Sequence, residues 1–155
     1  MTGRQYRAVF KAVAVTAAQD LFELVAAAGK TVEILGWGFH QTSDVGDAAE
    51  EILSIVVQRG ATASGSGGGS VTPTPQSVTD AAFGGTCERN NTSQAASGTI
   101  VDVDTRPFNV RIGVDVAYQP EERPVLTGGE RMVWSMAAPA DSLTMSGYVT
   151  LVEKG

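Results

Sequence analysis

The sequence predicts an all-β protein, an antiparallel β-sandwich of jelly-roll type with about eight strands. Three observations lead there: apolar and polar residues alternate with a period of two in several short segments, no segment has a convincing long helical pattern, and glycine and proline punctuate the chain. The chain has 155 residues, the size of one domain. We therefore expect a single domain over 1–155 with its own core and no need for disulfides.

The C-terminal end holds two predicted strands around which the rest of the chain is organised. Met132, Trp134 and Met136 share one face of the first run, and the second run places Leu143, Met145, Val149 and Leu151 on one face. Between the runs stands Pro139, which cannot donate to a strand ladder. The pattern predicts two half-buried strands joined as a hairpin, against which the rest of the chain packs.

The N-terminal third is expected to supply three strands. Residues 6–16 alternate around a lysine, as an early strand would. Residues 17–28 fit a helix ending at Gly29 or a short strand, and both remain open; we favour the strand because its neighbours are strands. Residues 32–39 place Glu33, Leu35, Trp37 and Phe39 on one face, with glycines flanking the tryptophan so that a backbone or ring can approach.

The middle and late segments add further strands. Residues 52–59 form a short β-branched run that predicts a strand buried on most of one face. Another short strand is expected at 100–103. Residues 108–118 alternate most regularly of all, which predicts one continuous central strand with Ile112 and Val114 facing inward.

Residues 60–98 differ in composition, with a glycine-serine run, a Pro-Thr-Pro sequence and an asparagine cluster. The sequence predicts one long Gly/Pro-rich loop here, and connections of this length are uncommon unless functional or disordered. Two interpretations stand: a mobile surface loop, or an arm that orders against a partner. The candidate partner contacts of such an arm are Ser64, Gly67, Pro73, Pro75, Asn90 and Asn91.

Charge and cysteine content exclude several classes of function. The net charge of −6 repels phosphate, so we expect no nucleic-acid partner. No apolar run approaches the ~20 residues of a membrane-spanning helix, and Lys11 interrupts the apolar stretch that a signal peptide would need. Cys87 is the single cysteine, so no intrachain disulfide is possible and an ordinary partly buried thiol is expected.

No catalytic, cofactor or metal site is predicted, so the chain is not expected to be an enzyme. His40 is the single histidine, too few for the metal site of a jelly roll, and no nucleophile elbow accompanies it. Two groups of acids could form a cation site and a glycosidase pair, respectively, but both fit solvated faces better. The first group is Asp44, Asp47, Glu50 and Glu51, and the second is Asp102, Asp104 and Asp115.

Taken together, several motifs resemble small proteins encoded among the structural genes of tailed bacteriophages. These motifs lie at 15–23 (VTAAQDLFE), 41–51 (QTSDVGDAAEE), 65–69 (GSGGG), 72–75 (TPTP), 90–92 (NNT), 118–124 (YQPEERP), 128–133 (GGERMV) and 139–147 (PADSLTMSG). The likeness spans nearly the whole chain.

That resemblance implies a jelly-roll virion component without catalytic residues or cofactors. The implied role is a capsid decoration, or cement, protein on the exterior of the phage head, where its partners are the major capsid protein and further copies of itself. Such jelly rolls often assemble as closed cyclic trimers, which match a local threefold axis of a capsid. The alternative is a receptor- or carbohydrate-binding head of a phage tail fibre.

Overall fold

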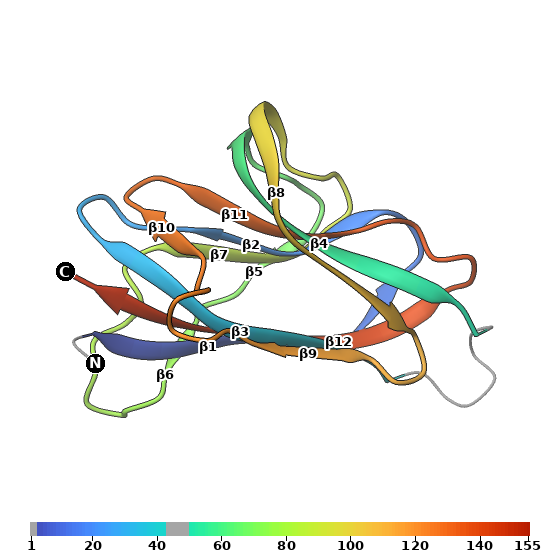
Figure 1. Cartoon of the computed structure of the whole chain (residues 1–155), viewed down its shortest axis with the longest axis horizontal. Coiled ribbons are helices and arrows are strands. Elements are labelled where there is room, and N and C mark those ends of the chain that lie inside the picture. Colours follow the sequence, from blue (N-terminus) through green and yellow to red (C-terminus); the bar gives the residue numbers. More distant parts are fainter. Residues whose placement is uncertain (1–2, 43–49) are drawn as a thin grey trace.

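The computed structural model describes residues 3–42 and 50–155, and this part of the chain is all-β, with twelve strands and no helix. The strands form two antiparallel sheets that face each other as in a β-sandwich (Figure 1). Sheet A has the order β10-β3-β12-β1-β6, with β9 also paired to β3, and sheet B has the order β5-β7-β2-β11-β4-β8.

The strands have the following bounds. Sheet A contains β1 (Arg4–Val15), β3 (Thr31–Gln41), β6 (Thr74–Pro75), β9 (Val114–Ala117), β10 (Val125–Thr127) and β12 (Leu143–Lys154). Sheet B contains β2 (Gln19–Val25), β4 (Ile52–Ala63), β5 (Gly69–Ser70), β7 (Thr86–Asn91), β8 (Ala96–Asn109) and β11 (Arg131–Met136).

The core lies between the sheets and is centred on aromatic rings. Phe10 and Phe39 of sheet A meet Phe22 of sheet B with ring centroids 5.1–6.2 Å apart. Trp37 is fully buried beside them, and its indole Nε1 donates a 2.9 Å hydrogen bond to the Tyr118 hydroxyl. The buried tryptophan thus finds the polar partner that burial of its N–H requires.

Several sequence predictions are confirmed. Residues 17–28 contain the strand β2, and not a helix. Met132, Trp134 and Met136 are buried on β11, and the predicted face of β12 is buried as well. The glycines beside Trp37 allow the expected close approach, because a Cβ at Gly36 would lie 2.4 Å from the Val116 carbonyl oxygen.

The predicted C-terminal hairpin is wrong. Strand β11 pairs with β2 and β4 in sheet B, whereas β12 pairs with β1 and β3 in sheet A. The segment around Pro139 therefore crosses from one sheet to the other. The alternation shows that each strand has one buried face, but it does not identify the neighbour to which its backbone bonds.

The predicted face of residues 32–39 is also wrong in its first half. Gly36 lies opposite Thr150 of β12 and Ile34 lies opposite Leu151, so Leu35 is an extra residue at a β-bulge. A bulge reverses the alternation. Ile34 points inward before it and Trp37 after it, which leaves Glu33 and Leu35 only half-buried.

Residues 108–118 are not one strand. Strand β8 ends at Asn109, the amides of Ile112 and Gly113 both donate to the Asn109 carbonyl oxygen, and β9 begins at Val114 in the other sheet. Gly113 takes a φ of +80°, which favours glycine. Ile112 is 78% exposed on this turn, so the prediction that it faces inward is wrong.

Residues 60–98 are not one long loop. Strand β4 continues to Ala63, β8 begins at Ala96, and β5, β6 and β7 lie between them, so the described chain has twelve strands instead of about eight. The segment is ordered against its own domain. Strand β7 pairs along β2 of sheet B, and β6 pairs with the start of β1.

Candidate functional site

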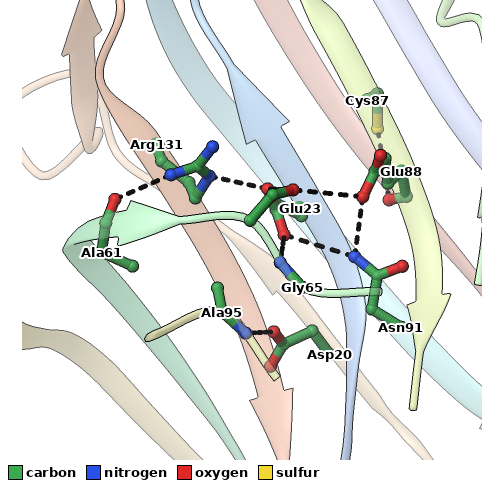
Figure 2. Close-up of polar contacts among 10 residues, drawn as sticks. Asp20, Glu23, Ala61, Gly65, Cys87, Glu88, Asn91, Ala95 and Arg131 are labelled. Atoms are coloured by element: carbon green, nitrogen blue, oxygen red, sulfur yellow. Dashed lines mark hydrogen bonds and ion pairs between the residues drawn. The ribbon is translucent and has the colours of Figure 1, made fainter. Parts of the chain in front are cut away.

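Residues 64–70, which we call the glycine-rich segment, cover a buried carboxylate on sheet B. It is that of Glu23, whose side chain is only 3% exposed (Figure 2). Its Oε1 accepts hydrogen bonds of 2.6 Å from both Arg131 Nε and Ser64 Oγ. Its Oε2 accepts from the Gly65 amide at 2.9 Å and from Asn91 Nδ2 at 3.2 Å. Four donors thus replace the water that burial removes, as a buried charge requires.

A second carboxylate and a backbone carbonyl extend this Glu23 network. Asn91 Nδ2 also donates to Glu88 Oε2 at 2.8 Å, and Arg131 Nη1 donates to the Ala61 carbonyl oxygen at 3.0 Å. The network joins β2, β7, β11 and the end of β4. Because both Glu23 oxygens and two of the three Arg131 nitrogens bond within the domain, we interpret the network as structural.

A further buried acid, Asp20, holds the connection between β7 and β8. Its Oδ2 accepts a 2.6 Å hydrogen bond from the Ala95 amide, and Gln94 Nε2 lies 3.4 Å from Oδ1. Burial raises the pKa of Asp20 to about 6, against hydrogen bonds from Ala95, Ser135 and Gln94 that lower it, while the charge of Glu23 raises it. The carboxyl group therefore titrates in the mildly acidic range.

The six candidate contacts predicted from the sequence do not form one exposed arm. Asn90 and Asn91 are buried, the latter inside the Glu23 network, and Gln19 Nε2 donates to Asn90 Oδ1 at 2.9 Å. Pro73 is also buried, and Pro75 is half-buried where it pairs with Tyr6. Only Ser64 and Gly67 are exposed, so most of these residues serve the fold of the domain itself.

Sequence reasoning overlooked Asp20 and Glu23. The signal was present, since Glu23 interrupts the apolar residues 21–25 and Asp20 directly precedes them, in a strand buried along nearly its whole length. A carboxylate within such a run implies a nearby donor set, which the glycine-rich segment supplies. Glycine is needed there because a Cβ at Gly68 would lie 2.1 Å from the Arg89 carbonyl oxygen.

Of the residues considered for catalysis, His40 and Asp115 form an exposed pair, whereas Asp102 and Asp104 have other partners. His40 Nε2 lies 3.1 Å from Asp115 Oδ2, and both side chains are exposed at 41% and 56%. Burial raises the pKa of Asp115, but the hydrogen bond from Tyr148 and the contact with His40 together lower it by more. The pKa of Asp115 therefore lies below its usual range. Asp104 instead accepts from Tyr118 at 2.8 Å and pairs with Arg106.

The remaining acids are also engaged individually. Gln58 Nε2 donates to Asp102 at 2.9 Å, Asn109 Nδ2 donates to Glu50 at 2.6 Å, and Glu51 accepts from the Ala140 amide. Asp44 and Asp47 lie outside the described residues. Within the described ranges, no group of three or more histidine, cysteine or acidic side chains could hold a metal ion.

Cys87 is buried, and this burial raises the pKa of its thiol. A buried thiol with a raised pKa contributes little thiolate, so Cys87 acts as a small core residue.

Strand β8 is a fourteen-residue strand at the edge of sheet B, seen at the top of Figure 1 where it pairs with the end of β4. Of its side chains only Phe108 is buried, while Ile100, Val101 and Val103 are 41%, 46% and 38% exposed. An edge strand leaves backbone donors and acceptors unpaired along one side. Exposed β-branched residues on such an edge are typical of an interaction surface.

A groove with a volume of about 440 Å³ lies where β4 and β8 extend past the turn between β10 and β11. We call it the β8 groove. The groove is lined by two arginines, one glutamate, two threonines, one valine and three small residues, which are glycine or alanine. Its lining residues are Arg59, Gly60, Ala61, Thr62, Thr99, Val101, Gly129, Glu130 and Arg131.

The comparisons with known proteins found no match among protein-family models, curated proteins or solved structures. Among the described residues, no helix has the length and apolar character needed to cross a membrane.

Proposed function

We propose that the protein is a non-enzymatic virion component, a decoration or cement protein that binds the major capsid protein on the exterior of a phage head. The observation that carries this proposal is β8: a long, exposed edge strand with three partly exposed β-branched aliphatic side chains. Adhesion to another protein is the use to which such an edge is suited. The virion as its location comes from the sequence resemblance.

The strand pairing supports a jelly-roll assignment. If β5 to β7 are set aside and β9 and β10 are counted as one strand, eight strands remain. In chain order, the first pairs with the eighth (β1–β12), the second with the seventh (β2–β11), the third with the sixth (β3 with β9 and β10) and the fourth with the fifth (β4–β8). A long hairpin wound into two sheets has this order, and jelly rolls occur in viral capsid proteins.

The acids give no support to enzymatic activity, because each described one examined above has a structural partner. We further propose that the protein assembles as a homotrimer, since a closed cyclic trimer matches a local threefold axis of a capsid. A carbohydrate-binding tail-fibre head is the second candidate. It is less favoured because the β8 groove has no aromatic lining residue on which a sugar ring could stack.

The experiment is to add the purified protein to phage heads that lack it. We expect saturable binding at a copy number close to a simple ratio with the major capsid protein, and a higher temperature for genome release. A handful of copies per particle, or binding to host cell-wall polysaccharide without binding to heads, would contradict the decoration role and favour the tail-fibre alternative.

A further inference from the structure

We propose that the β8 groove binds a carboxylate of an acidic, extended peptide segment that lies along β8. This inference rests on the proposed function in one respect, namely that β8 is the surface to which a protein partner binds. It adds the chemistry of that partner: a negatively charged side chain, or a chain-terminal carboxylate, presented from a β-like segment.

The β8 groove contains two guanidinium groups. Arg59 is exposed, and none of the ion pairs among the described residues uses it. The second guanidinium, Arg131, is held in place by Nε on Glu23 and Nη1 on the Ala61 carbonyl oxygen; its third nitrogen has no interaction among the residues drawn in Figure 2. Two guanidinium groups on the wall of one groove favour a carboxylate ligand.

Two carboxylates offset part of this positive charge, Glu130 in the lining and Glu23 behind Arg131, but both already accept hydrogen bonds from the protein itself. The Thr127 amide and hydroxyl donate to Glu130 Oε2 at 2.6 Å and 3.0 Å, which lowers the pKa of Glu130 and ties the group to its own turn. Arg59 is close enough to contribute to that lowering. The protein carries a net charge of −6, so the exposed guanidinium group of Arg59 is a local positive site on an otherwise acidic protein.

The edge strand β8, which borders the groove, favours a peptide over a sugar acid as the ligand. Thr99 and Val101 of β8 line the groove, so a ligand in it lies directly beside an edge strand. Unpaired backbone groups of an edge strand bind an extended peptide by adding a strand, and side-chain pockets then give the specificity. A sugar ring would gain no stacking partner, since the lining has no aromatic side chain.

The test uses a fluorescein-labelled nonapeptide of alternating valine and threonine with one central glutamate, and the same peptide with glutamine in that place. By fluorescence anisotropy at low salt, we expect the glutamate peptide to bind about tenfold more tightly, the ratio that a lost charge-assisted contact of roughly 1.4 kcal/mol produces. Equal binding of the two peptides, or no binding of either, would overturn the proposal.

Two charge-removing variants test whether the peptide carboxylate contacts Arg59. Arg59→Gln should weaken binding of the glutamate peptide about tenfold, whereas Lys11→Gln, which removes one exposed positive charge from β1 of sheet A, should leave it within about twofold. If Arg59→Gln is unstable, amide and arginine Nε shifts of the wild-type protein titrated with the peptide decide instead. Shifts confined to residues outside the groove would overturn the proposal, as would tighter binding of an oligogalacturonate than of the glutamate peptide.

Binding to phage heads separates this inference from the proposed function. If wild-type protein binds heads and Arg59→Gln binds them equally well, the groove inference fails and the decoration role stands. If the protein binds the glutamate peptide through Arg59 but does not bind heads, the decoration role fails and the groove inference stands.

Discussion

At the residue scale, the buried charges explain why the glycine-rich segment is ordered. A carboxylate such as that of Glu23 can be buried only with donors for both oxygens, and two of its four donors, Ser64 Oγ and the Gly65 amide, come from this segment. The residues that we expected to contact a partner from an arm, such as Asn91, are instead donors inside the domain. The sequence shows the composition of the segment but not the carboxylate that it covers.

Glu23→Gln should destabilise the fold strongly. The substitution leaves the guanidinium of Arg131, itself largely buried, without its carboxylate. Removing one partner of a buried pair costs about 3–5 kcal/mol, whereas Glu121→Gln at an exposed position should change the free energy of unfolding by no more than about 0.5 kcal/mol. Urea unfolding of both variants measures the difference, and a loss below about 1 kcal/mol for Glu23→Gln would show that the pair is solvated.

Asp20 should give the fold a pH dependence of its own. Its folded pKa, raised to about 6 from an ordinary value of 3.8, means that the folded state holds a proton that the unfolded state has released between these two values. Stability from this group is therefore complete below about pH 4 and is lost as the pH rises through about 6, with a total of roughly 2–3 kcal/mol.

The matched variant for this prediction is Asp20→Asn, which cannot ionise. Relative to it, the free energy of unfolding of the wild-type protein should fall between pH 4 and pH 7, as measured by urea denaturation at each pH. Parallel curves for the two proteins would show that Asp20 titrates normally in the folded state.

At the element scale, period-two alternation predicted strands well and their limits poorly. It located the buried faces of β11 and β12, because burial of one face is what the pattern records. It failed over 108–118, because alternating apolar residues run on through a turn there. The residues that mark this turn, Asn109 and Gly113, occupy polar positions of the same alternating pattern. Bulges such as the one at Leu35 are invisible to a strict period of two.

The turn after β8 gives a direct test of this correction. Gly113→Ala should lower the free energy of unfolding clearly more than Gly129→Ala. The two glycines have similar positive φ angles, +80° and +84°. Only Gly113 is crowded, because an added Cβ would lie 2.3 Å from His40 Nδ1 and 2.8 Å from the Phe39 carbonyl oxygen. We expect about 1–2 kcal/mol for the backbone at either site and further loss at Gly113.

Ile112→Ala completes the comparison, with an expected change within about 0.5 kcal/mol because the side chain is 78% exposed. Thermal unfolding of the three variants ranks them. A loss of more than about 2 kcal/mol for Ile112→Ala would restore the continuous inward-facing strand that the sequence pattern favoured.

At the scale of the whole molecule, the outermost strands of the two sheets differ in length. The other outermost strands, β5, β6, β9 and β10, have two to four residues, whereas β8 has fourteen. Short edge strands offer little to a neighbouring chain, and a long one with apolar residues offers much. An all-β fold followed from the sequence, but the assignment of strands to sheets did not, because it depends on partners far away in the chain.

If β8 is the adhesive edge, charges placed on its exposed side chains should oppose binding to phage heads. Replacing Ile100 and Val103 with lysine should leave the free energy of unfolding almost unchanged, since both side chains are partly exposed and neither lines the β8 groove. It should reduce binding to phage heads at least tenfold, because lysine on an edge strand opposes pairing with another chain. The control replaces Val78 and Val125, two exposed valines away from β8, with lysine and so adds the same charge. If the control weakens binding as much as the β8 variant does, added positive charge is the cause and β8 is not the contact; if only the β8 variant loses binding, the edge of sheet B carries the adhesion.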